Sequence, residues 1–144
     1  MNELIIRFIE KQKCSSVCCV DGDGQPYCFI CFYAFNAEQS LLYFKSSPSA
    51  LHIKLLSQNP VIAGSILPDK LQALSVKGIQ FQGLFLPVQH ELSKNASTHY
   101  HKKHPLALAI PGEERTILLT RVKMTDSSKL FGNKYFWERA EKEI

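Results

Sequence analysis

Three β-prone stretches follow one another between residues 15 and 44, separated only by short turns. They are 15–21 (SSVCCVD), 27–35 (YCFICFYAF) and 40–44 (SLLYF), and the turns are 21–26 (DGDGQP) and 36–39 (NAEQ). Strands joined by such short turns form an antiparallel meander. The second stretch is aromatic and has almost no polar residue on either face, so we expect a strand that is covered on both sides.

The rest of the chain continues this pattern of short strands and adds short helices. Asn2 is a suitable N-cap, and apolar residues at helical spacing predict an amphipathic helix to about Lys13. We expect a second helix at 50–56, strands at 61–67, 79–88 and 116–124, and a helix-compatible polar segment at 91–104. Gly83, inside its strand, suggests a β-bulge or a close backbone approach. Residues 1–144 are therefore predicted to form one α+β domain built on an antiparallel sheet or barrel.

Composition and charge narrow the classes of partner. Of the 144 residues, 45% are apolar and 21% are charged, as in globular proteins. The net charge of +4 is spread along the chain, whereas a nucleic-acid-binding protein usually concentrates basic charge on one face. The start of the chain lacks the features of a secretory signal, and no apolar stretch approaches the ~20 residues of a membrane span. We expect a cytoplasmic protein whose partner is a small anionic molecule rather than nucleic acid or membrane.

Five cysteines, Cys14, Cys18, Cys19, Cys28 and Cys31, lie in the first quarter of the chain. An odd number without a signal peptide favours reduced thiols over a disulfide framework. Cys28 and Cys31 have the spacing of a redox or zinc knuckle, but residues three apart on a strand point to opposite faces. We therefore expect core cysteines that pack as small hydrophobic residues, with a redox or zinc site as the less favoured alternative.

His99, His101 and His104 are metal ligands by residue type only. On a helix, His101 and His104 share a face and His99 lies on the other side, and no adjacent cysteine or carboxylate completes a zinc site. A solvated polar helix end is the favoured interpretation. GxSxG, HExxH and P-loop motifs do not occur in the sequence, so no catalytic residue and no metal ligand is predicted.

The segment 45–54 (KSSPSALHIK) has the features of an anion site. A strand ends in a hydroxyl-rich loop, a helix begins, and Lys45, His52 and Lys54 lie nearby. Backbone N–H groups at a helix start, together with hydroxyls and cations, can bind a phosphate. An ordinary capped helix with exposed lysines is the competing interpretation of this pattern.

Three further stretches carry a resemblance to a known family: 78–83 (GIQFQG), 100–105 (YHKKHP) and 123–137 (KMTDSSKLFGNKYFW). With the order of elements from about Cys14 onward, they make the chain resemble the pyridoxamine 5′-phosphate oxidase-like FMN-binding split barrels, and most closely the bacterial YhbP-like proteins. The resemblance implies an α+β fold, an antiparallel six-stranded split β-barrel with short flanking helices. It also implies a homodimer that holds two FMN molecules in clefts at the subunit interface, the flavin supplying two-electron chemistry.

The same resemblance, followed residue by residue, implies an altered flavin site. Phe29 and Ala34 stand where the oxidase has an Arg and a Lys at the ends of its cofactor-binding strand. Ala50 and Leu51 replace the Arg-Lys pair that grips the FMN phosphate, and Gly78 replaces a flavin-contacting Gln. A phosphate that leaves water needs charge-assisted donors, each worth about 1.5–3 kcal/mol. The candidate cofactor-binding residues that could substitute are Lys45, Ser46, Ser47, Ser49, His52, Lys134 and Trp137.

Two functions follow from this comparison. The first is an FMN- or other flavin-binding oxidoreductase that acts on an unknown small substrate, with a degenerate phosphate clamp. The alternative is a non-catalytic, dimeric split-barrel module that binds another small ligand or mediates association, because the basic clamp is missing. The anion-site features of the segment 45–54 and the resemblance motivate the first, which is slightly favoured because the implied fold carries the flavin cleft.

Overall fold

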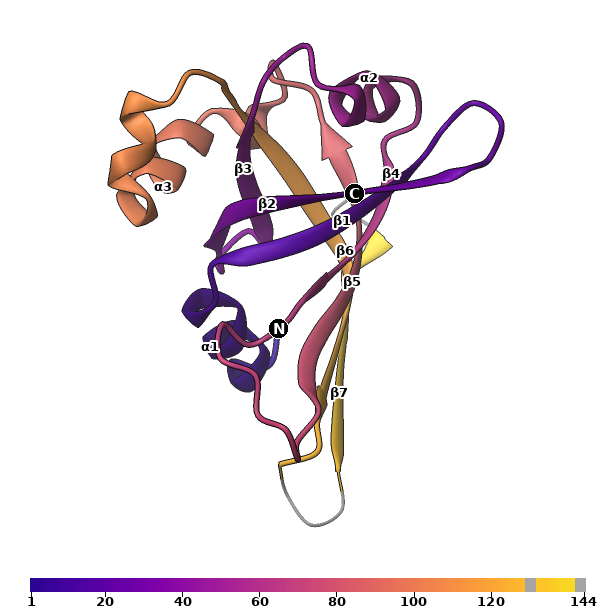
Figure 1. The fold of residues 1–144 in the computed structure, drawn as a ribbon, viewed down its shortest axis with the longest axis vertical. Coiled ribbons are helices and arrows are strands. Elements are labelled where there is room, and N and C mark those ends of the chain that lie inside the picture. The colour runs from indigo at the N-terminus through magenta and orange to yellow at the C-terminus, as the bar shows by residue number, and fades with distance from the viewer. Residues whose placement is uncertain (129–131, 142–144) are drawn as a thin grey trace.

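All strands belong to one antiparallel sheet of order β3-β2-β1-β4-β5-β6-β7, and a further pairing of β3 with β6 closes the first six into a barrel (Figure 1). The computed structural model describes residues 1–128 and 132–141. The strands are β1 (Cys14–Val20), β2 (Pro26–Asn36), β3 (Leu41–Ser46), β4 (Val61–Ile66), β5 (Lys77–Leu86), β6 (Glu113–Asp126) and β7 (Asn133–Glu138). The predicted six-stranded antiparallel barrel with short flanking helices is confirmed, and β7 is an additional strand.

The described residues form three α-helices outside the barrel wall: α1 (Glu3–Lys11), α2 (Leu51–Gln58) and α3 (Ala96–Lys103). Two 3₁₀ turns, Glu91–Ser93 and Pro105–Ala109, flank α3. In Figure 1, α1 and α2 lie towards opposite ends of the barrel and α3 lies beside β3. Neither these helices nor any other within the described ranges has the length and apolar character needed to cross a membrane.

The N-terminal helix forms where the sequence predicted it. Asn2 caps α1, because its Oδ1 accepts the backbone N–H of Leu4 at 2.8 Å. Ile5, Phe8 and Ile9 form the buried face of the helix. This face joins the core of the barrel, so α1 is fixed to the sheet by apolar packing.

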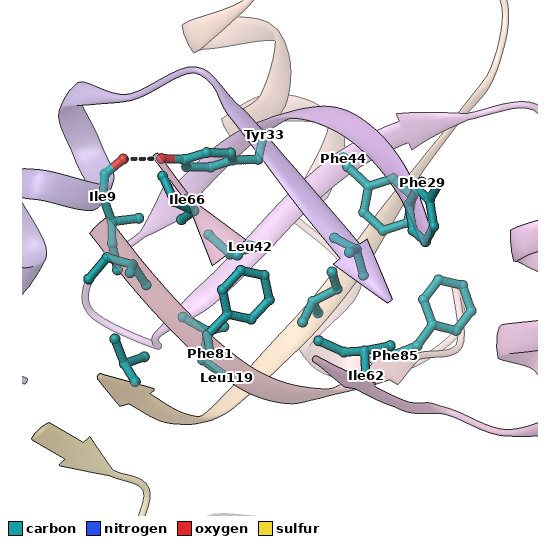
Figure 2. Close-up of a cluster of buried hydrophobic side chains, with 14 of the residues drawn as sticks. Ile9, Phe29, Tyr33, Leu42, Phe44, Ile62, Ile66, Phe81, Phe85 and Leu119 are labelled. Atoms are coloured by element: carbon teal, nitrogen blue, oxygen red, sulfur yellow. Dashed lines mark hydrogen bonds between the residues drawn. The ribbon is translucent and has the colours of Figure 1, made fainter. Parts of the chain in front are cut away.

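The barrel interior is filled by apolar side chains from all six of its strands and from α1 and α2. Figure 2 shows Phe29, Phe44 and Phe85 gathered in one part of this core. A second, smaller cluster lies between β3 and α3 and includes Tyr43 and Tyr100. Because β3 is buried on both faces, α3 covers the side of β3 that faces away from the barrel interior.

The irregularity predicted at Gly83 is present in β5. The register of β5 on β6 shifts between Gln82 and Gly83. A Cβ atom on Gly83 would lie 2.6 Å from the backbone oxygen of Leu118. The close backbone approach therefore occurs at Gly83, and the extra residue of the register shift, Thr120, lies on the partner strand β6.

β2 is not covered on both faces, in contrast to the expectation from its composition. Phe29, Tyr33 and Ala34 are buried, whereas Ile30 is 80% exposed and Phe32 is 55% exposed. The prediction is wrong for the single chain, because the described residues, including His104 beside the Phe32 ring, leave most of these two outward-facing side chains uncovered. The apolar residues that suggested a strand covered on both sides therefore form an exposed apolar surface on the outer face of β2.

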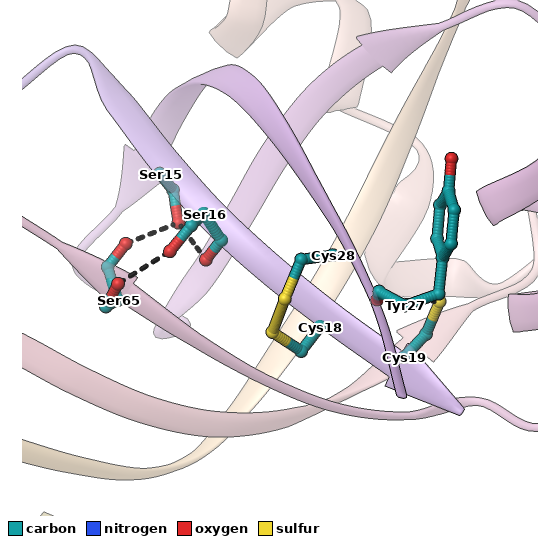
Figure 3. The surroundings of a disulfide bond; sticks show 7 residues. All are labelled: Ser15, Ser16, Cys18, Cys19, Tyr27, Cys28 and Ser65. Carbon is teal, nitrogen blue, oxygen red and sulfur yellow. Dashed lines mark hydrogen bonds between the residues drawn. A yellow bond between two sulfur atoms is a disulfide. The ribbon is translucent and has the colours of Figure 1, made fainter. Parts of the chain in front are cut away.

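The expectation of five reduced thiols is wrong for Cys18 and Cys28, which form a disulfide (Figure 3). The two residues are opposite each other in the register of β1 and β2, with Cα atoms 4.2 Å apart. Sequence spacing drew attention to Cys28 and Cys31, but pairing across strands is decided by register. Cys28 is exposed rather than a core cysteine, whereas Cys19 is buried and Cys31 is half-buried.

Candidate functional site

The loop between β3 and α2 borders a pocket of about 310 Å³, called here the loop pocket. Four of the predicted site residues line it: Lys45, Ser46, Ser47 and His52. They come from the end of β3, the following loop and the first turn of α2. The remaining wall is largely apolar and consists of Phe29, Ile30, Cys31, Phe32, Phe44, Tyr100, Ala107, Ile110 and Pro111.

Lys45 is the cation of the loop pocket, and its ammonium group already has partners inside the chain. Its Nζ donates to the backbone oxygen of Ala107 at 2.8 Å and lies 3.6 Å from Oε1 of Glu114. Nε2 of His101 lies 3.2 Å from Lys45 Nζ and 3.4 Å from the same Glu114 oxygen. The side chain of Lys45 is only 10% exposed. The Glu114 carboxylate therefore offsets part of the positive charge that Lys45 offers to an anion.

His52 is a neutral hydrogen-bonding group in the wall of the loop pocket. Its ring stacks on Phe29, with centroids 3.9 Å apart and planes inclined by 10°. Its Nε2 lies 2.7 Å from Oγ of Ser46. Burial lowers the pKa of His52 below its ordinary value. His52 can therefore stack and hydrogen-bond near pH 7, but it adds no positive charge for an anion.

The start of α2 presents backbone donors that no side chain caps. Its N-cap residue is Ala50, which makes no side-chain capping bond. The hydroxyls of Ser47 and Ser49 lie 3.0 Å apart on the exposed loop just before the helix. Unfilled N–H groups at a helix N-terminus attract anions. The predicted anion site therefore has its backbone and hydroxyl donors on one loop.

Apolar residues occupy the positions at which the family resemblance implied a basic clamp. Phe29 provides the surface on which the imidazole stacks, and Ala34 is buried in the cluster beneath α3. Ala50 is the N-cap of α2, and Leu51, its first residue, is 52% exposed. Gly78 belongs to β5 and does not line the loop pocket. None of these five positions supplies a cation.

The two predicted residues near the end of the chain lie away from the loop pocket. Trp137, in β7, lines a separate cavity of about 940 Å³ that is bordered by β1, β4, β5, β6 and β7, called here the sheet groove. Lys134 is exposed on β7 opposite Thr125 and lines neither cavity. Within one chain, neither residue lines the loop pocket with Ser46, Ser47 and His52.

The side chains of His101, His104 and Glu114 lie around the loop pocket, although they were not predicted to be near it. The predicted solvated helix end is wrong for His101 and His104, and His99, of the same prediction, is half-buried with its ring centroid 5.3 Å from that of Tyr43. His101 contacts Glu114, and His104 Nε2 lies 2.7 Å from the backbone oxygen of Tyr33. Their positions depend on how α3 docks on β2 and β3, which no local motif encodes. Among the described residues, no group of three or more His, Cys, Asp or Glu side chains could hold a metal ion.

The chain is similar in sequence to known proteins and similar in fold to solved structures. No family model matches the chain. The UPF0306 protein of Photorhabdus laumondii is 31% identical over 137 residues, which is 95% of this chain and 95% of that protein.

Three solved structures illustrate the fold. An FMN-binding protein of Nostoc punctiforme, related to pyridoxamine 5′-phosphate oxidase, has a TM-score of 0.68 at 10% identity and covers 98% of this chain and 91% of its own. An FAD-binding protein of Mesorhizobium loti has a TM-score of 0.67 at 21% identity, with 89% and 96% covered. A heme-binding protein of Mycobacterium smegmatis has a TM-score of 0.74 at 12% identity, covering 91% of this chain, which spans only 55% of that longer protein. These likenesses show the fold alone, that of the oxidase-like split barrels.

Proposed function

Because the chain belongs to the UPF0306 family and has a split-barrel fold, we propose that it binds FMN or a related flavin at the loop pocket. The observation that carries this proposal is the uncapped start of α2 beside Ser47, Ser49 and Lys45. The resulting function is that of a flavin-binding oxidoreductase-like protein that acts on an unknown small substrate.

The donors at the start of α2 fit a phosphate group. The hydroxyls of Ser47 and Ser49 lie 3.0 Å apart just before the uncapped start of α2, and Lys45, which lines the loop pocket with Ser47, adds one cation that Glu114 partly offsets. Hydrogen bonds from hydroxyl and N–H donors to an ionised phosphate contribute about 1.5–3 kcal/mol each, but such donors add no positive charge to balance the dianion. This site therefore replaces a strong guanidinium-type clamp with several mostly uncharged donors, and we expect correspondingly weaker FMN binding.

The apolar wall of the loop pocket suits the aromatic ring system of a flavin. When bound, a flavin supplies two-electron redox chemistry. The part of the chain is to bind and enclose: Ile30, Phe32 and Ile110 offer an apolar surface, and neutral His52 offers a hydrogen bond beside it. Their arrangement favours a planar, largely apolar ligand with one anionic end.

We further propose that a second copy of the chain completes the site. A volume of about 310 Å³ is at the lower end of the roughly 300–1,000 Å³ usual for ligand pockets. The pocket opens beside Ile30, Phe32, Leu108 and Ile110, which are 55–80% exposed. A homodimer that packs across β2 would bury these side chains, and Trp137 and Lys134 of the second copy would then be available to the ligand.

The homodimer is tested by light scattering after gel filtration. We expect the wild type to be a dimer and Phe32→Asp to be a monomer with an unchanged circular dichroism spectrum. Leu74→Asp is the matched control, because Leu74 is fully exposed and lines neither cavity. A monomeric wild type, or a Phe32→Asp variant that stays dimeric, would overturn this part of the proposal.

Flavin binding is tested by titrating the purified protein with FMN and following flavin fluorescence and absorbance. Ser47→Ala/Ser49→Ala removes two hydroxyl donors, each worth about 1.5–3 kcal/mol towards an ionised phosphate, so FMN binding should weaken about 150-fold or more. Riboflavin, which lacks the phosphate, should bind the wild type and this double variant equally. Lys45→Gln should also weaken FMN binding, whereas Lys54→Gln, an exposed lysine of α2, should not. Absent flavin signals, or equal FMN affinity in all variants, would refute the proposal.

A non-catalytic module for another small ligand is the second candidate, and two observations favour it. Glu114 reduces the attraction of Lys45 for an anion, while neutral His52 is the form of histidine that binds metal centres such as heme iron. A hemin titration separates the two functions. A Soret shift that is lost in His52→Ala, in a protein that does not respond to FMN, would favour the module.

Two finer assignments also stay proposals. The motif at 123–137 supports a place among the YhbP-like proteins, although its residues 129–131 lie outside the described ranges. A cytoplasmic location remains the prediction from sequence, and cell fractionation checks it.

A further inference from the structure

We propose that Cys18 and Cys28 form a redox-active dithiol–disulfide pair that exchanges with low-molecular-weight thiols such as glutathione. The pair bridges β1 and β2 beside the sheet groove, which Cys18 lines. Neither cysteine lines the loop pocket. The proposal is therefore independent of flavin binding.

The bridge is accessible from solvent in the single chain. Cys28 is exposed and Cys18 is half-buried, and Figure 3 shows the bridge between neighbouring strands, with Ser16 and Ser65 further along the sheet. Cys19, the next residue on β1, is buried in the core and only 1% exposed. Thiol–disulfide exchange requires direct access of a thiolate to one sulfur. The sulfur of the more exposed residue, Cys28, is therefore the first target.

The bridge is not needed to hold its two strands together. The β1–β2 ladder runs from Cys14 opposite Phe32 to Val20 opposite Pro26, on both sides of the bridge. The hairpin turn is closed by a backbone hydrogen bond of 2.9 Å from Asp21 to Gln25. After reduction, this ladder keeps the two thiols opposite each other, so that the disulfide can form again without a search through unfolded conformations. A bridge whose removal leaves its surroundings in place suits a reversible reaction.

The neighbouring free cysteines are poor internal reductants. Burial raises the pKa of Cys31 to about 12, and burial and the charge of Asp69 raise the pKa of Cys14. The thiolate is the attacking species, so these thiols are largely inactive near neutral pH. The electrons must come from outside the chain, which fits a small, freely diffusing thiol.

The exchange is balanced with two thiols. One external thiolate attacks Sγ of Cys28, the bond between Cys18 and Cys28 breaks, and the Cys18 thiolate leaves and takes up a proton. A second external thiolate then attacks the external sulfur of the mixed disulfide. This step releases the oxidised small molecule and the Cys28 thiol. Two electrons pass from the two external thiols to the protein disulfide.

The test is a titration of the folded, full-length protein in buffers of fixed ratios of reduced to oxidised glutathione. Samples are quenched in acid and alkylated under denaturing conditions. The number of alkylated thiols is then determined from the intact mass by mass spectrometry. The number of free thiols should rise from three to five as the buffer becomes more reducing, and return to three on reoxidation. The circular dichroism spectrum should not change. Peptide mapping should place both new thiols at Cys18 and Cys28.

Two variants serve as controls. Cys14→Ser/Cys31→Ser should keep the two-thiol step with the same midpoint, because neither residue takes part. Cys28→Ser should lose it. If the thiol count stays at three in every native glutathione buffer and rises only when denaturant is present during the incubation with glutathione, the bridge is structural and does not exchange. A count of five even in excess oxidised glutathione would show that no bridge forms. Either result overturns the proposal.

Discussion

Replacing Tyr33 by Phe removes one oxygen atom from the contact between α1 and the barrel. The Tyr33 hydroxyl donates to the backbone oxygen of Ile9 at 2.6 Å (Figure 2), and Tyr33 is only 1% exposed. Ile9 lies in the last turn of α1, where carbonyl groups lack partners within the helix. The donor that a longer helix would supply, the N–H of Lys13, is instead bonded to Asp69. The substitution therefore leaves the Ile9 carbonyl without a donor.

The magnitude follows from this loss. A buried hydrogen bond contributes about 0.5–1.5 kcal/mol net, and an acceptor left unsatisfied costs about 1–3 kcal/mol. The cation–π contact of Lys103, 4.5 Å from the Tyr33 ring centre, survives in phenylalanine. We expect Tyr33→Phe to lower the free energy of unfolding by about 1–3 kcal/mol. For a chain of 144 residues, this corresponds to a drop in Tm of about 3–10 °C.

Urea and thermal unfolding followed by circular dichroism measure this effect. Tyr27→Phe is the matched control, because Tyr27 lies on the same strand, is 38% exposed and has no hydroxyl hydrogen bond among the described residues. The control should stay within about 0.5 kcal/mol of the wild type. If Tyr33→Phe is equally stable, the hydroxyl does not anchor α1, and the reasoning about the helix end fails.

Three further predictions concern the barrel, the loop pocket and the free thiols. Gly83→Ala should cost about 1–3 kcal/mol in urea unfolding, because its Cβ would meet a backbone oxygen at 2.6 Å, whereas Gly22→Ala, with open space around it, should be near neutral. Burial lowers the pKa of His52, so the unfolded chain takes up that proton first; stability should fall as the pH drops below about 6.5, and less steeply in His52→Gln. Burial raises the pKa of Cys31 to about 12, so iodoacetamide at pH 8 should label exposed Cys14 well before Cys31, as peptide mass spectrometry can show; equal rates would contradict this.

Much of the fold was predictable because its signals are local. The Asn2 cap, the turn before β2 and the interrupted β5 each depend on residues within one element, and all were found from sequence. The seventh strand was not, because β7 is defined by pairing with β6 rather than by a strong pattern of its own. The Cys18–Cys28 bridge was missed for the same reason. It depends on which residue of β2 lies opposite Cys18, and sequence spacing does not give that register.

The candidate site also combines contacts that local sequence predicts with contacts that only strand pairing creates. Ser46, Ser47 and His52 line one pocket, as expected for a strand end, a loop and a helix start that are consecutive in sequence. The partner that most changes the electrostatics, Glu114, lies on β6 opposite Lys45 on β3. Closure of the barrel creates this contact, so it could be inferred only from the pairing of two strands that are far apart in sequence.

The alternation of side chains along β2 determines the positions of the disulfide, of the ring under His52 and of the exposed apolar residues beside the loop pocket. One set, including Phe29 and Tyr33, fills the core. The side chains at the alternate positions Cys28, Ile30 and Phe32 point the other way and are exposed. A shift of one residue in register would move the whole set to the opposite face. The same register therefore places Cys28 opposite Cys18, keeps Phe29 under His52 and leaves Ile30 and Phe32 open beside the loop pocket. It follows that changes in the core of β2 should affect disulfide exchange and ligand binding together, whereas changes on its exposed face can separate them.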